Sequence, residues 1–149
     1  MTITENQICT FMVGGFYFGI EVQKIQEVIR FQEMTFVPLA SEVVAGLINL
    51  RGEIVTAIDL KKRLGIESPP NENYRPMNII VRSEDELVSL LVDRMDDIME
   101  LDEALFERPP ETLQGPAKEV ISGTYKLPSK LLLILDVEKT ILIAHSEKS

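Results

Sequence analysis

Cysteine, histidine and tryptophan are almost missing from this sequence of 149 residues, which has one cysteine, one histidine and no tryptophan. Because Cys9 is the only thiol, no disulfide can form within the chain, and this suits a reducing compartment. A zinc site needs several Cys or His ligands at short spacing, which Cys9 and His145 cannot supply. His145 lies in a polar C-terminal segment, so a histidine-activated nucleophile is not expected.

Long apolar runs and phosphate-binding loops are also missing, and no leader is expected. No uncharged run reaches the ~18 residues that a membrane span needs. The opening MTITENQICT lacks the basic and apolar regions of a secretory signal peptide, so a cytoplasmic protein is expected. Neither a P-loop nor a GxGxxG motif occurs. Lys and Arg number 15 against 24 Asp and Glu, and the net charge of −9 argues against nucleic acid or an anionic membrane as main partner.

The residues that are present describe a folded, β-rich chain. Hydrophobic residues make up 45% of it and charged residues 26%, enough for a packed core in one domain or in two closely joined subdomains. Apolar runs alternate with Gly and Pro turns, a pattern typical of hairpins. The expected strands cover residues 8–13, 16–20, 47–50, 54–58, 78–81, 87–92, 120–125 and 131–135.

Short helical pieces are expected between these strands. The apolar residues of 22–29 and of 93–101 follow roughly the three- and four-residue spacing of a helix. Asp59 is a suitable N-cap for a helix over 60–64, and Asp136 opens another helix. Strand content is nevertheless expected to exceed helix content.

The two halves of the chain resemble each other. GLINLRGEIVTAIDLKK from Gly46 aligns with GTYKLPSKLLLILDVEK at an offset of 77 residues, and IEVQKIQEVI from Ile20 matches LLVDRMDDIM at an offset of 70. Chance similarity among β-rich segments is the alternative to a duplication. We predict an internal duplication, with subdomains at about 7–66 and 77–143, each a small barrel, and with strands able to cross between them.

One turn stands out as a candidate binding feature. In VAGLINLRGEIV, two apolar strands meet at Arg51-Gly52, and we expect positive φ at Gly52. Arg51 then projects from a rigid turn, where its guanidinium is well placed to read a partner's carboxylate or carbonyl groups. The alternative is an ordinary solvated charge at a turn.

Several stretches resemble the CheW family of chemotaxis coupling proteins. VVAGLINLRGEIVTAIDLKKRLG resembles the family signature, and FGIEVQKIQEVIRF resembles its first strand-and-helix segment. LVSLLVDRMDDIMEL, ERPPE and SGTYKLPSKLLLILDVEK resemble further stretches in family order, so the likeness covers about residues 8–143. Thr56 is a departure, because the family often has proline there.

The resemblance implies a fold and a function. It implies two SH3-like β-barrel subdomains, with no catalytic activity, no cofactor and no small-molecule substrate. It implies an adaptor between the cytoplasmic tip of a chemoreceptor and the regulatory domain of a CheA-type histidine kinase, near the membrane only through receptors.

The resemblance also points to site residues. The family's emphasised arginine and glutamate carry over to Arg51 and Glu27, which the sequence permits to form an ion pair. Asn49 belongs to the same NLRG motif. The side chains of Ile25 and Val28, beside Glu27, are either core or an exposed binding ridge. Gly46 is expected to meet a backbone requirement and to let a partner approach closely.

Other functions stay open beside this one. An enzyme working through Asp93, Asp96 and Asp97 is a second hypothesis, although no nucleophile or metal set converges with them. A coupling protein of a twitching or other non-swimming array is a third. The acidic stretch 84–111 lacks the residue order of an EF-hand loop, so we interpret it as a solvated face rather than a calcium site.

Overall fold

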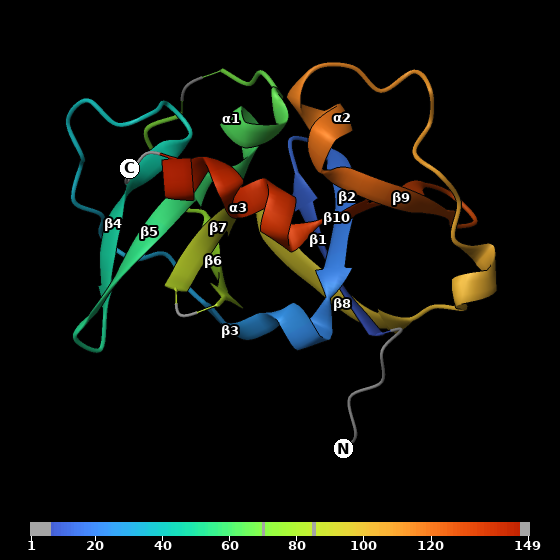
Figure 1. Cartoon of the computed structure of the whole chain (residues 1–149), viewed down its shortest axis with the longest axis horizontal. Helices are drawn as coiled ribbons and strands as arrows, with labels where there is room; N and C mark the ends of the chain where they lie inside the picture. The colour runs from blue at the N-terminus through green and yellow to red at the C-terminus, as the bar shows by residue number, and fades with distance from the viewer. Residues whose placement is uncertain (1–6, 70, 85, 147–149) are drawn as a thin grey trace.

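The structure is a computed structural model that describes residues 7–69, 71–84 and 86–146, with side chains described up to residue 142. The expectation for His145 therefore concerns a side chain outside the described set. The predicted predominance of strands is confirmed, and Figure 1 shows the two sheets side by side with the α-helices against them.

Ten strands and five short helices form within these ranges. The strands are β1 (Gln7–Val13), β2 (Phe16–Glu21), β3 (Ile25–Ile29), β4 (Val44–Leu50), β5 (Glu53–Asp59), β6 (Met77–Ser83), β7 (Glu86–Val92), β8 (Arg94–Glu100), β9 (Ile121–Lys126) and β10 (Leu131–Leu135). The α-helices are α1 (Leu60–Leu64), α2 (Pro116–Val120) and α3 (Val137–Ser146), and two 3-10 turns are η1 (Val22–Lys24) and η2 (Glu103–Leu105).

The strands form two five-stranded sheets. The first sheet has the order β8-β1-β2-β10-β9 and the second the order β3-β6-β7-β5-β4. In each sheet, two antiparallel hairpins are joined by a parallel pair, β2 with β10 and β7 with β5. Among the described strands no pairing joins the two edges of either sheet, so both sheets are open rather than closed barrels.

The two sheets have the same topology, built from opposite halves of the chain. β1, β2, β10, β9 and β8 of the first sheet correspond in place to β6, β7, β5, β4 and β3 of the second. Each sheet thus takes one hairpin from one half and three strands from the other. The division at 7–66 and 77–143 describes the order along the chain, whereas the sheets are assembled across it.

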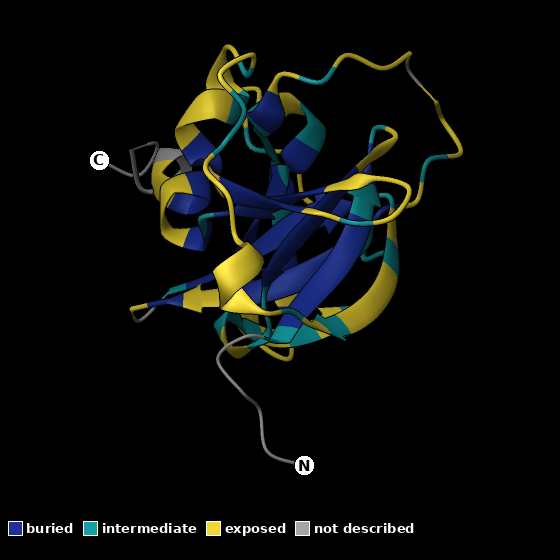
Figure 2. Cartoon of the chain, turned by 90° about the vertical axis from the view of Figure 1, so that its right-hand side faces the viewer, coloured by how far each residue is buried: buried dark blue, intermediate teal, exposed yellow. Residues whose placement is uncertain are grey.

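The central strands of both sheets are buried on both faces. The largest apolar cluster lies between them and includes Phe18, Leu90 and, from α3, Ile141. A second cluster lies on the other face of the first sheet and a third on the other face of the second. Alternate residues of one strand therefore enter different clusters, which explains why β10 reads as the unbroken apolar run LLLIL. Figure 2 shows the buried strands at the centre.

Two expected helical segments are strands, so these predictions were wrong. Only 22–24 forms a 3-10 turn, after which β3 pairs with β6, and 94–100 forms β8, which pairs with β1. Both segments are short and border a sheet edge, where the hydrogen-bond ladder of a neighbouring strand outweighs a weak helical periodicity.

The expected capped helices are confirmed, and the expected strands at 8–13 and 16–20 form a hairpin. Asp59 Oδ1 accepts a hydrogen bond from the backbone N of Lys62, and α1 ends at Gly65 in the left-handed region, with φ 72°. Asp136 Oδ1 accepts from the backbone N of Lys139 in the same way. Asp59 lies at the end of β5 and Asp136 directly follows β10. Corresponding aspartates therefore cap the helices that follow corresponding strands of the two sheets.

Candidate functional site

The turn between β4 and β5 holds Arg51 at its tip. Leu50 pairs with Glu53, and the two turn residues both have positive φ, 51° at Arg51 and 90° at Gly52. This is the backbone of a two-residue type I′ hairpin turn, so the expectation for Gly52 is confirmed. The Asn49 side chain accepts a hydrogen bond of 2.8 Å from the backbone N of Gly52. Asn49 therefore stabilises the turn that presents Arg51.

Glu27 comes from β3, one of the two edge strands of the second sheet. The pairing of β3 with β6 shifts register between Ile25 and Glu27, which lie opposite Val81 and Ile80. This bulge turns the two side chains to different faces of the sheet. Ile25 packs against the cluster between the sheets, as Val81 does, while Glu27 lies opposite Ile80 of the third cluster.

Arg51 and Glu27 form an ion pair. Arg51 Nη2 lies 2.5 Å from Glu27 Oε2, and the two side chains are 67% and 27% exposed. The pair joins the edge strand β3 to the turn at the far side of the same sheet, across the third cluster, which contains Leu50 and against which Ile29 packs. An exposed pair contributes about 0–1 kcal/mol to folding, so its main effect is to orient the turn. We call this arrangement an edge-to-turn ion pair.

The other predicted site residues have different surroundings. Val28 is 38% exposed on β3. Gly46 is buried, and a Cβ there would lie 2.8 Å from the carbonyl oxygen of Thr35, which bridges Leu47 through two hydrogen bonds. The close approach at Gly46 is thus made by a segment of the same chain.

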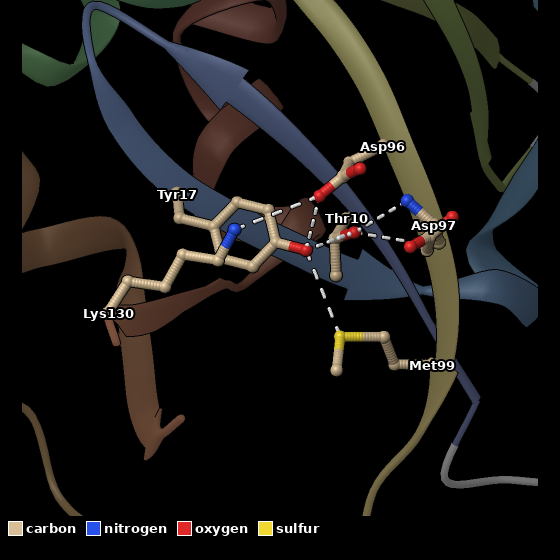
Figure 3. Close-up of polar contacts among 6 residues, drawn as sticks. All are labelled: Thr10, Tyr17, Asp96, Asp97, Met99 and Lys130. Carbon is tan, nitrogen blue, oxygen red and sulfur yellow. Dashed lines mark hydrogen bonds and ion pairs between the residues drawn. The ribbon is translucent and has the colours of Figure 1, made fainter. Parts of the chain in front are cut away.

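A second edge-to-turn ion pair lies in the first sheet. Lys130, in the turn between β9 and β10, lies 4.0 Å from Asp96 Oδ2 on the edge strand β8 and 3.9 Å from the centre of the Tyr17 ring. The Tyr17 hydroxyl lies 2.7 Å from Asp96 and 2.8 Å from Thr10 Oγ1 (Figure 3). Burial and the Asp96 carboxylate raise the pKa of Tyr17, which keeps the phenol protonated.

Sequence reasoning did not identify this second arrangement. The repeat offsets of 70 and 77 residues carry Glu27 to Asp97 and Arg51 to Pro128, so neither partner stands at the aligned position. The common feature is the place in the topology, an edge strand tied to a distant turn, which becomes visible only once the strand order is known.

The carboxylates proposed for catalysis bind separate partners. Asp93 accepts hydrogen bonds from the backbone N of Gly14 and from Tyr74, and Asp96 accepts one from Tyr17. Asp97 is exposed next to Asp96 on the same strand. Among the described residues, no group of three His, Cys, Asp or Glu side chains is arranged to hold a metal ion.

Comparison with known proteins identifies the family. The model of the CheW-like domain matches residues 7–144. The chain belongs to the CheW-like family. It is 28% identical to "Chemotaxis protein CheW" of Treponema pallidum (strain Nichols), over 91% of this chain and 81% of that protein. It is 30% identical to "Chemotaxis protein CheW" of Bacillus subtilis (strain 168), over 93% of this chain and 88% of that one.

A solved structure of the CheW-like family has the same fold. The crystal structure of scaffolding protein TtCheW from Thermoanaerobacter tengcongensis matches with a TM-score of 0.78 and 29% identity, covering 89% of this chain and 90% of that one. The SH3-like architecture implied by the sequence resemblance fits this CheW-like fold, with both sheets open. In the described part of the chain, no helix has the length and apolar character needed to cross a membrane.

Proposed function

We propose that this CheW-like chain is a chemotaxis adaptor without catalytic activity of its own, which couples the cytoplasmic tip of chemoreceptors to the regulatory domain of a CheA-type histidine kinase in the cytoplasm. Membership of the family supports the adaptor role, as do relatives whose names read chemotaxis protein and scaffolding protein. These names favour chemotaxis over the alternative of a non-swimming array.

The edge-to-turn ion pair of Glu27 and Arg51 is the observation that carries the proposal. It holds a charged turn in one orientation above an apolar cluster while leaving the Arg51 side chain 67% exposed. Val28, the next residue of β3, is 38% exposed but lies opposite Ile79 of the cluster between the sheets, so its side chain is on the other face of the sheet. An exposed arginine held in place is suited to recognise a partner, because little side-chain freedom is lost on binding.

The mechanism is geometric. Two sheets that share one core form a rigid body, so a receptor and a kinase bound to it hold a defined relative position. A change in receptor conformation then shifts the kinase between active and inactive states through differential contacts. No bond is made or broken on the adaptor.

The test uses Arg51→Ala and Glu27→Ala in reconstituted arrays of receptor, kinase and adaptor. The free energy of unfolding of each variant is expected to lie within about 0.5 kcal/mol of the wild-type value, because the ion pair lies at the surface. Each is expected to lose receptor control of kinase activity, and the double variant to be little worse than either single one, because the two residues act together. Arg108→Ala, an exposed arginine of the first-sheet side, is the matched control.

A charge swap separates orientation from direct contact. Glu27→Arg combined with Arg51→Glu restores the ion pair but reverses the charge that a partner meets. Continued loss of coupling in the swapped protein indicates direct recognition of Arg51, and recovery indicates that the pair acts by orienting the turn. If Arg51→Ala activates the kinase normally, this surface is not the coupling site.

A further inference from the structure

A surface cavity of about 290 Å³ lies on the first sheet, on the face away from the second sheet. Its floor is apolar and is formed by Ile8 of β1 and Ile134 of β10. Its walls are the rings of Phe106 and Tyr125, and its rim carries carboxylates. The edge-to-turn ion pair of Glu27 and Arg51 belongs to the second sheet, so this cavity is a separate site.

The aromatic walls are held in place by the backbone. The rings of Phe106 and Tyr125 are tilted by 56° with their centres 5.3 Å apart. Glu107, next to Phe106, bridges Thr124 through two backbone hydrogen bonds of 2.9 Å. The Phe106 ring lies over Gly123, where any side chain would overlap it. Phe106 nevertheless remains 42% exposed, so part of its ring is open to a ligand.

The Tyr125 hydroxyl lacks a partner within the described chain. Tyr125 is only 6% exposed and lines the cavity, yet its hydroxyl makes no hydrogen bond to any residue that the structure describes. Burial and, after it, the charges of Glu103, Asp102 and Glu21 raise the pKa of this phenol. Among the described residues no buried side-chain oxygen or nitrogen lacks a hydrogen-bond partner, so this hydroxyl is accessible at the cavity, where a ligand can supply a hydrogen bond.

The rim is acidic and continues along the sheet. Glu21 and Glu103 line the cavity, and Glu21 also accepts a hydrogen bond from Gln23. Glu21 and Ser122 line a second cavity as well, which runs on to Asp136 and Glu138 and contains one basic residue, Lys24. The two cavities together form an acidic groove that is longer than one side chain. This length favours an extended basic segment as the ligand over a small free amine.

We propose that this cavity binds an arginine side chain presented by a basic segment of a partner protein. A guanidinium stacks on aromatic rings, pairs with carboxylates and donates N–H groups to a phenolic oxygen, and the cavity offers all three. The apolar floor accommodates the methylene stem of the side chain. The proposal does not depend on the adaptor function, because it concerns other residues on the other sheet.

The test is an NMR titration of the full chain with the blocked tripeptide acetyl-Ala-Arg-Ala-amide. Saturable shifts are expected at the amides of Ser122, Tyr125 and Glu103. The same tripeptide with citrulline, which is neutral and similar in shape, is expected to bind at least ten-fold more weakly. The lysine tripeptide is expected to bind more weakly than the arginine one, because an ammonium lacks the planar fork.

Variants connect the binding to the cavity. Tyr125→Phe removes only the hydroxyl and is expected to weaken arginine binding about five-fold, as for one lost hydrogen bond. Glu103→Gln, at an exposed position, is expected to weaken it about three-fold. Glu119→Gln, an exposed glutamate outside the cavity, serves as control and is expected to leave binding unchanged. Equal binding of the arginine and citrulline peptides, or arginine shifts confined to other surfaces, overturns the proposal.

Discussion

At the scale of single residues, Asp93 joins three parts of the chain. Its carboxylate accepts a hydrogen bond of 2.8 Å from the backbone N of Gly14 and one of 2.5 Å from Tyr74, and it lies 3.2 Å from Lys61 Nζ. Burial alone would raise the pKa of Asp93, but the hydrogen bonds and Lys61 outweigh it and lower this pKa. The charged carboxylate thereby holds together the β1–β2 turn, α1 and the linker between α1 and β6, to which Tyr74 belongs.

Asp93→Asn should therefore destabilise the protein in a pH-dependent way. A carboxyl whose pKa is lowered on folding stabilises the native state above its unfolded pKa, near 3.8, and loses this effect as pH falls through the folded pKa. We expect a loss of about 1–2 kcal/mol in the free energy of unfolding at pH 7, shrinking below about pH 4. Urea unfolding curves recorded between pH 3 and pH 7 measure this loss, and Asp97→Asn, at an exposed position, is the control. A loss of equal size at pH 3 and pH 7 would contradict the role of the charge.

At the scale of elements, the two long-range ion pairs start from different turns. The β4–β5 turn has two residues, both with positive φ, and carries Arg51 at its tip. The β9–β10 turn is longer, with Leu127 N donating to Lys130 O at 2.9 Å, and a lysine reaches across the Tyr17 ring instead. The shorter turn carries the longer side chain, arginine, and the longer turn carries lysine. In each open sheet an ion pair therefore connects an edge strand to a distant turn.

The two-residue turn makes Gly52 the sensitive position of this element. A Cβ on Gly52 would meet no atom within 4 Å, so any cost comes from its φ of 90° and not from crowding. Gly52→Val should lower the free energy of unfolding by about 1–3 kcal/mol, because β-branched residues rarely adopt this conformation. Thermal melts measure the loss, and Glu53→Val, at the next exposed position, is the control. An unchanged melting temperature for Gly52→Val would show that the turn relaxes to another geometry.

At the scale of the whole molecule, the two halves of the chain depend on each other. In the first sheet, β1 and β2 of the first half pair with β8 and β10 of the second, and the second sheet shows the reverse arrangement. Either half on its own lacks the strands that neighbour its hairpins and part of the cluster between the sheets, to which both halves contribute buried residues. Isolated hairpins are at best marginally stable in water.

Cutting the chain after Ser68, in the exposed linker, tests this dependence. We expect neither the fragment 1–68 nor the fragment 69–149 to give a β-sheet circular dichroism spectrum or a cooperative melt alone. Mixing the two should restore both, because every pairing between the halves forms without the linker. A cooperative melt of either fragment by itself would show that the halves are independent subdomains.

The sequence by itself determined the features that depend on neighbours in the chain. The hairpin at Arg51-Gly52, the helix cap at Asp59 and the strand at 131–135 each follow from a few adjacent residues, whose turn, capping and strand preferences act locally. The repeat offsets correctly related the two sets of hairpins. Arg51 and Glu27 entered through resemblance to a family, since exposed charges alone do not mark a site.

Only the tertiary structure decided the features that depend on distant partners. Residues 25–29 and 94–100 become strands because β6 and β1 offer them hydrogen bonds, and no local pattern contains that information. Tertiary structure also brings Glu27 to Arg51, Asp96 to Lys130, and the Phe106 ring to Tyr125. The physical reason is that strand pairing and burial are long-range interactions, stronger than the small differences between helix and strand propensity in short segments.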